Sequence, residues 1–100
     1  MDLQALLTLS LDDKTFANPR RINLLEQVAN TGSISQGAKL AGISYKAAWD
    51  AINEMNTVMP EPVVNSEKGG KGGGGAKLTE FGKRLLKVYS ITAQVQAMAL

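Results

Sequence analysis

Residues 44–56 carry side chains that could form hydrogen bonds with the edges of base pairs. On a helix with about 100° between successive residues, the polar and aromatic members share one side: Lys46, Trp49, Asp50 and Asn53, with Tyr45 at its edge. Lysine can reach guanine or a phosphate, asparagine can pair with adenine, and aspartate can accept from cytosine. The aromatic rings could contact a thymine methyl group or the sugars. This pattern predicts a helix that reads the major groove of DNA.

Three of these residues have simpler interpretations that the sequence leaves open. Trp49 could belong to the hydrophobic core, although its neighbours on the helix wheel are polar. Asp50 could be a solvated acid or could pair with Lys46, four residues earlier. Tyr45 could be partly buried, with only its hydroxyl in water.

The residues before this segment are predicted to form a strand and a helix. Leucines alternate over residues 3–11, which favours a strand with one buried face, and residues 12–14 have the composition of a turn. Asn18 can then cap a helix that starts at Pro19 and closes at Gly32. The apolar face of this helix is expected to contain Ile22, Leu25, Val28 and Ala29.

A helix-turn-helix is predicted for residues 33–58. A short helix over about 34–41 is followed by Gly42, which suits a tight turn because its φ can be positive. The reading helix, 45–58, ends before Pro60. Hydroxyl and backbone N–H groups at the two helix starts could hold phosphates. The hydroxyl groups are those of Ser33, Ser35 and Ser44.

A β-hairpin with a glycine-rich tip is predicted next. Residues 63–66 and 76–78 have the composition of short strands, and six of the seven residues from Gly69 to Gly75 are glycine. A hairpin directly after a helix-turn-helix is typical of a wing, here residues 63–78. A nucleotide-binding loop is disfavoured because Ala76 stands where a P-loop requires lysine, whereas a disordered linker remains an alternative. The wing residues expected to contact DNA phosphates are Lys68, Lys71 and Lys77.

The charges are unevenly distributed along the chain. Residues 1–67 hold five Lys/Arg and eight Asp/Glu, a net charge of −3, whereas residues 68–100 hold six and one, a net charge of +5. A basic block of this kind indicates a polyanion partner. A solvated lysine face is the alternative.

The last predicted helix, residues 79–100, repeats apolar or small residues at alternating steps of four and three. This spacing is that of a coiled-coil seam, and a helix of about 20 residues is longer than so small a core requires. We therefore predict a dimerisation helix. Its contact residues are Phe81, Leu85, Val88, Thr92, Val95 and Ala99.

The composition excludes several classes of function. The chain has no cysteine and no histidine, so disulfides, thiolate or imidazole metal sites and histidine catalysis are excluded. The Asp and Glu residues are scattered along the chain and form no convergent catalytic set, so we expect no enzymatic activity. No apolar run is long enough to span a membrane, and the N-terminus lacks the basic region of a signal peptide. We expect a cytoplasmic protein with no membrane contact and no cofactor bound within these residues.

The chain resembles the N-terminal domain of the bacterial molybdate-responsive regulators of the ModE family. The similarity covers nearly the whole chain and is carried by LLTLSLDDKTFANPRRINLLEQVANTGSIS, GSISQGAKLAGISYKAAWDAINEMN and GGKGGGGAKLTEFGKRLL. More distantly, the arrangement is similar to the winged domain of LysR-type regulators. The resemblance implies a dimer that binds a palindromic operator upstream of molybdate-transport genes and represses them when molybdate is bound. It assigns Ser33–Gln36 and Ser44–Asn53 to DNA reading, Lys68–Lys77 to the wing, and the residues from Phe81 onward to the dimer.

Members of that family continue into C-terminal modules that bind molybdate, whereas this chain ends at Leu100. The chain could be a domain excised from a longer protein or a naturally short relative. In either case, molybdate is expected to bind outside these residues.

The predicted fold is mainly α with a small β component. Residues 1–100 are expected to form a single winged helix-turn-helix domain with a long C-terminal dimerisation helix. The predicted function is sequence-specific binding of double-stranded DNA by a homodimeric transcriptional regulator. The alternative is a protein-interaction module, in which the long apolar helix recruits another protein and the winged fold is a scaffold.

Overall fold

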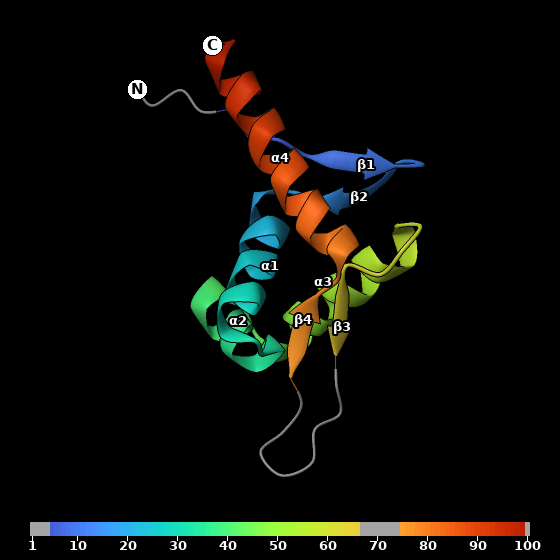
Figure 1. Ribbon diagram of the computed structural model, residues 1–100, viewed down its shortest axis with the longest axis vertical. Helices are drawn as coiled ribbons and strands as arrows, with labels where there is room; N and C mark the ends of the chain where they lie inside the picture. The colour runs from blue at the N-terminus through green and yellow to red at the C-terminus, as the bar shows by residue number, and fades with distance from the viewer. Residues whose placement is uncertain (1–4, 67–74, 100) are drawn as a thin grey trace.

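Three helices near the N-terminus share one hydrophobic core. The computed structural model describes residues 5–66 and 75–99, and within them it has four helices and two antiparallel two-stranded sheets (Figure 1). The first three helices are α1 (Pro19–Thr31), α2 (Ile34–Ala41) and α3 (Tyr45–Val58). These bounds confirm the predicted helix-turn-helix.

The helix ends follow from local residue types. Gly32 and Gly42 close α1 and α2 in the left-handed conformation, with φ of 70° and 73°, where a Cβ would be strained. Each helix start has a polar side chain that accepts a hydrogen bond from a first-turn N–H, which would otherwise lack a partner. These caps are Asn18, Ser33, Ser44 and Thr79.

The core residues of α1 differ in part from the predicted apolar face. Ile22, Leu25 and Val28 are buried as expected, but Ala29 is exposed and Leu24 is buried in its place. The reason is that α1 contacts α2 as well as strands and helices from both ends of the chain. A helix covered on several sides buries a wider arc than the single stripe that a helix wheel assumes.

The predicted strand over residues 3–11 is wrong for residues 5–8, which are irregular. Strand β1 covers only Leu9–Leu11 and pairs with β2 (Lys14–Ala17), which the alternating leucines did not indicate. Asp12 and Asp13, the predicted turn, connect them with φ of 52° and 65°. Positive φ at both central residues is what the type I′ turn of a two-residue hairpin requires. The hairpin brings Phe16 and Ala17 into the core.

A second hairpin, the predicted wing, follows α3. Strands β3 (Val64–Ser66) and β4 (Ala76–Leu78) pair in antiparallel register, with Asn65 opposite Lys77. Val64, Ala76 and Leu78 are buried, so the root of the wing is part of the core. The predicted contacts Lys68 and Lys71 lie outside the described residues.

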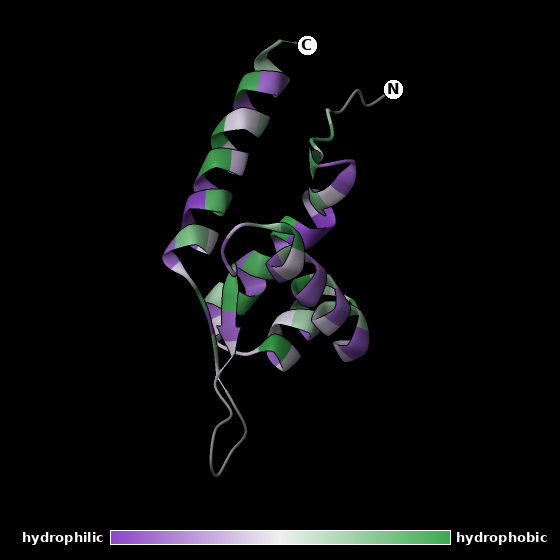
Figure 2. Cartoon of the chain, turned by 90° about the vertical axis from the view of Figure 1, so that its right-hand side faces the viewer, coloured by the Kyte–Doolittle hydropathy of each residue, from purple (hydrophilic) through white to green (hydrophobic). Residues whose placement is uncertain are grey.

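The last helix, α4 (Glu80–Met98), is anchored at its start and projects beyond the body at its end (Figures 1 and 2). Gly82 lies against the backbone of Val63, where a Cβ would overlap the carbonyl oxygen. Leu85 and Tyr89 are buried, and the Tyr89 hydroxyl donates to the Leu7 carbonyl oxygen at 2.7 Å. In the described part of the chain, no helix combines the length and apolar character needed to cross a bilayer.

Candidate nucleic-acid interface

A tight turn fixes the angle between α2 and α3. After Gly42, the Ile43 N–H donates to the Ala38 carbonyl oxygen at 3.0 Å and the chain enters the Ser44 cap of α3. On the other side of α2, Gly37 packs against α1, where a Cβ would meet Val28. Helix α2 is thus held by its neighbours at short range, and it supports α3 as a rigid element.

Helix α3 has a buried face and an exposed face, and Trp49 from the predicted polar side is half-buried. Ala48, Ile52 and Met55 are buried. Ala51 is half-buried and packs against the same core. The opposite face is solvent-exposed at Lys46, Asp50 and Asn53. This polar face of α3 is therefore available to a partner.

The two aromatic residues of α3 occupy different environments. Trp49 is half-buried and packs against the core, so its simpler interpretation holds in part. Tyr45 is 55% exposed at the helix start, and its ring meets that of Trp49 edge-on, with centroids 6.2 Å apart. Such T-shaped contacts are favourable. Trp49 therefore supports the Tyr45 ring at the exposed edge.

Lys46 and Asp50 form an ion pair along the exposed face. Their side-chain atoms Nζ and Oδ2 lie 2.9 Å apart, and the side chains are 85% and 64% exposed. Pairing with Lys46 is one of the two simpler interpretations that the sequence left open for Asp50. A pair so exposed contributes only about 0.3–0.5 kcal/mol. Lys46 can therefore exchange Asp50 for a phosphate or a base at little cost.

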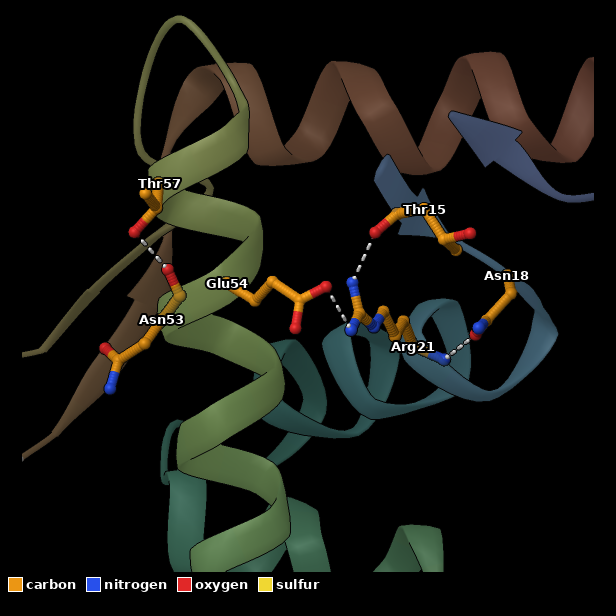
Figure 3. Close-up of polar contacts among 6 residues, drawn as sticks. All are labelled: Thr15, Asn18, Arg21, Asn53, Glu54 and Thr57. Carbon is orange, nitrogen blue, oxygen red and sulfur yellow. Dashed lines mark hydrogen bonds and ion pairs between the residues drawn. The ribbon is translucent and has the colours of Figure 1, made fainter. Parts of the chain in front are cut away.

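Asn53 and Glu54 are adjacent in sequence and point in different directions (Figure 3). The Asn53 amide is turned away from α1 and toward solvent, whereas Glu54 faces Arg21 of α1. Glu54 Oε1 lies 2.9 Å from Arg21 Nη2, and Arg21 Nη1 donates to the Thr15 carbonyl oxygen at 2.9 Å. One guanidinium thus joins β2, α1 and α3.

The predicted phosphate-holding serines lie at the starts of α2 and α3, and Gln36, which the resemblance assigns to DNA reading, lies in the first turn of α2. Ser35, Gln36 and Ser44 are exposed, and Ser33 is half-buried. The Ser33 and Ser44 hydroxyls accept from the Gln36 and Ala47 N–H groups at 3.1 and 3.0 Å. The reciprocal half of a capping box is absent at Ser33, because its N–H donates to the Thr31 hydroxyl. Both serines are caps.

The wing and α4 contribute the other predicted contacts. Lys77 is exposed on β4. Of the predicted dimer residues, Val88, Thr92, Val95 and Ala99 are exposed, Phe81 is half-buried, and Leu85 lies in the core of its own chain. The exposed stripe on α4 therefore begins at Val88 and not at Phe81.

Three residues that position these elements were not identified from the sequence. Arg21 and Glu54 connect α1 to α3, and Asn56 connects α3 to the start of the wing, accepting from the Val63 N–H at 2.8 Å. Their partners are 33 and 7 residues away. No periodic pattern in the sequence marks such pairs.

A helix-turn-helix whose second helix exposes a polar face, followed by a hairpin rooted in the same core, is the architecture of winged helix-turn-helix proteins. The sequence profile of the bacterial regulatory helix-turn-helix proteins of the lysR family matches residues 19–83, and the chain belongs to this family.

Curated relatives align with most or nearly all of the chain. "Transcriptional regulator ModE" of Yersinia pestis is 60% identical over 99 residues, which are 99% of this chain and 38% of the relative. "DNA-binding transcriptional dual regulator ModE" of Escherichia coli K12 is 59% identical over the same share of each chain. "Molybdenum transport protein ModE" of Azotobacter vinelandii is 46% identical over 85 residues, 32% of its length. The chain thus spans less than two-fifths of these relatives.

Proposed function

We propose that this chain is the DNA-reading part of a molybdenum-responsive transcriptional regulator and that α3 enters the major groove of its operator. The observation that carries the proposal is the exposed face of Lys46, Asp50 and Asn53 on the second helix of a helix-turn-helix. A helix fits this groove, and each base pair presents a distinct set of donors and acceptors there. The names of the relatives support the regulatory role.

The side chains of α3 suggest a division of roles. Asn53 is turned to solvent and has both a donor and an acceptor, the combination that recognises adenine. Lys46 is the most exposed charge of the face and can reach a guanine or a phosphate. Tyr45 stands at the edge, where its ring can meet a thymine methyl group or a sugar. We expect discrimination between bases to depend most on Asn53.

Attraction to the phosphates is expected to come from outside α3. Residues 68–100 carry a net charge of +5, and exposed Lys77 places one of these charges on the wing. Basic groups that displace counterions from DNA supply affinity that does not depend on sequence and that falls with salt. The serine-capped starts of α2 and α3 present backbone N–H groups that can also hold phosphates.

A homodimer on a palindromic operator is the second part of the proposal. Helix α4 exposes a row of large apolar side chains that are Val88, Ile91, Val95 and Met98. Beside it runs a groove of about 360 Å³ between α1 and α4, lined by Ile22 and Glu26 on one side and by Tyr89, Ala93 and Ala97 on the other. An apolar row next to a groove is suited to a two-fold contact in which each helix covers the other. Two copies would then place two α3 helices on successive turns of one DNA face.

The test begins with duplexes that this chain selects from a random pool. Affinity for a selected duplex is compared with affinity for a scrambled duplex of equal length by fluorescence anisotropy at physiological salt. We expect at least about a thousandfold difference, the lower end of specific recognition. Asn53→Ala should relax the preference at one base pair by about 1–3 kcal/mol. Equal affinity of the unmodified chain for both duplexes would refute the function.

The exposed apolar row of α4 also favours a second candidate, a module that recruits another protein through α4. Analytical ultracentrifugation with and without the selected duplex separates the two. A dimer that binds one duplex supports the regulator, whereas a monomer that ignores DNA supports the interaction module.

The molybdenum in the relatives' names is proposed to act on the regulator through a site outside this chain. We accordingly propose that residues 1–100 form one DNA-binding domain that works in the cytoplasm without a cofactor of its own and catalyses no reaction. Titration of the chain with molybdate in a calorimeter should release no heat of binding, and a saturable heat would overturn this assignment.

A further inference from the structure

Asn56, in the last turn of α3, is hydrogen-bonded to the strand that starts the wing. Its Oδ1 accepts from the Val63 N–H at 2.8 Å and from the Val64 N–H at 3.4 Å, and its Nδ2 donates to the Val64 carbonyl oxygen at 3.2 Å. The side chain is half-buried, and both valines are buried. Within the described residues, every hydrogen bond between α3 and the start of β3 passes through this amide.

The chemistry of this contact requires a primary amide on a short side chain. The Asn56 amide pairs with the chain at Val63 and Val64 much as the peptide group of a neighbouring strand would, because its oxygen accepts and its NH2 group donates. Aspartate keeps the acceptor and loses the donor. Glutamine has both groups but holds them one methylene further from α3. Alanine leaves the buried N–H of Val63 without this partner, which is costly in a part-buried place.

The other side of the same segment is held by the start of α4. The Thr79 N–H donates to the Val63 carbonyl oxygen at 3.0 Å, and its hydroxyl donates to the Pro62 carbonyl oxygen at 2.6 Å. Strand β4 is also hydrogen-bonded to the connection between α1 and α2, where the Ala76 N–H donates to the Gly32 carbonyl oxygen at 2.9 Å. The wing root is therefore anchored to the rest of the fold without Asn56, and Asn56 adds the link to α3.

We propose that Asn56 is a positioning residue that sets the wing relative to the reading helix, so that Lys77 on β4 and Asn53 on α3 contact one DNA site together. The inference rests on the proposed function and assigns a role inside it. Two contacts held at a fixed spacing bind as one unit, because the second contact forms at a high effective concentration. A wing that can shift against α3 loses this gain while keeping its charge.

The test is a double-mutant cycle in DNA affinity between Asn56→Ala and Lys77→Ala. Lys77→Ala alone should weaken binding to the selected duplex several-fold, and Asn56→Ala alone about tenfold. In the Asn56→Ala background, Lys77→Ala should change affinity much less, because the lysine no longer arrives in place. Thr57→Ala is the matched control: its hydroxyl donates to the Asn53 carbonyl oxygen within α3 at 2.7 Å and does not reach the wing. In the Thr57→Ala background, Lys77→Ala should keep its full effect.

The outcomes separate this inference from the function on which it rests. Lack of discrimination by the unmodified chain refutes the function. Discrimination by the unmodified chain, together with Asn56→Ala and Lys77→Ala effects that multiply independently, refutes the positioning role alone. The positioning role is also refuted if the unmodified chain discriminates between duplexes but Lys77→Ala leaves its affinity unchanged. If Asn56→Ala fails to fold, Asn56→Gln takes its place, because glutamine keeps the donor and the acceptor but holds them one methylene further from α3. The same non-additivity with Lys77→Ala is expected in that background.

Discussion

The ion pair between Arg21 and Glu54 allows a quantitative prediction about how α3 is held. The Arg21 side chain is only 18% exposed, and its guanidinium reaches both the Thr15 carbonyl oxygen and Glu54. The bond to Thr15 joins a charged donor to a part-buried carbonyl, a class of hydrogen bond that contributes about 1.5–3 kcal/mol. Glu54 is 52% exposed, so solvent screens the ion pair to about 0.5 kcal/mol. Arg21→Ala should therefore lower the free energy of unfolding by about 2–3.5 kcal/mol.

Urea denaturation followed by the fluorescence of Trp49, the chain's single tryptophan, measures this loss. The protein concentration must be held constant, because dimerisation would add to the apparent stability. In thermal unfolding, the same loss should lower Tm by at least about 8 °C. Glu54→Ala should cost about 0.5 kcal/mol in the unmodified chain and close to nothing in the Arg21→Ala background.

The neighbouring Arg20 provides the control for this prediction. It is exposed in the same turn of α1, and Arg20→Ala should change stability by less than about 0.5 kcal/mol. The reasoning is refuted if Arg21→Ala behaves like Arg20→Ala. It is also refuted if Glu54→Ala costs as much without Arg21 as with it, since the two side chains would then be energetically independent.

Three further predictions concern other contacts. Gly82→Ala should destabilise the fold by about 3 kcal/mol or more, seen in urea melts, because its Cβ would overlap the Val63 carbonyl oxygen. Burial raises the pKa of Tyr89. The stability that the neutral Tyr89 hydroxyl contributes is therefore complete below about pH 10, the pKa in the unfolded chain, and is lost as pH rises through the pKa in the folded chain. The stability advantage of the unmodified chain over Tyr89→Phe, about 1 kcal/mol at pH 7, should shrink in denaturation experiments at alkaline pH. Asp50→Asn should tighten binding to selected and scrambled duplexes alike in anisotropy titrations, because it removes an anion beside Lys46; a loss confined to the selected duplex would instead place Asp50 on a base.

The elements that the sequence predicts well are those with local determinants. The caps at Ser33 and Ser44 and the glycine at Gly42 set the bounds of α2 and α3, because a cap or a left-handed residue depends on its own few neighbours. The buried side of α3 follows from the 3.6-residue period for the same reason. The strand predicted from alternating leucines failed because residues 5–8 find no partner strand in the described chain, whereas Leu9–Leu11 pair across a two-residue turn.

The contacts that orient the site could not be found in this way. Arg21 and Glu54 lie on different helices, and whether they meet depends on how the whole fold places α1 and α3. Asn56 occupies an ordinary position near a helix end, and only the path of the chain after Pro62 brings Val63 back to it. Trp49 shows the same limit: the wheel places it among polar neighbours, while the surrounding fold half-buries it against the core. A wheel describes one helix and omits what covers it.

In the proposed function, the charges of the chain separate attraction to DNA from the reading of its sequence. Helix α3 carries one lysine and two acids, and the ion pairs Lys46–Asp50 and Arg21–Glu54 occupy all three. A face neutralised in this way attracts any DNA only weakly, so it has little tendency to hold the wrong sequence. In this proposal, the basic second part of the chain supplies the attraction that all DNA sequences share. If Asn56 fixes the wing to α3, the sequence-independent attraction holds DNA in the place where Asn53 can read a base. Specificity then depends on the rigidity of the link between wing and helix as much as on the side chains that meet the bases.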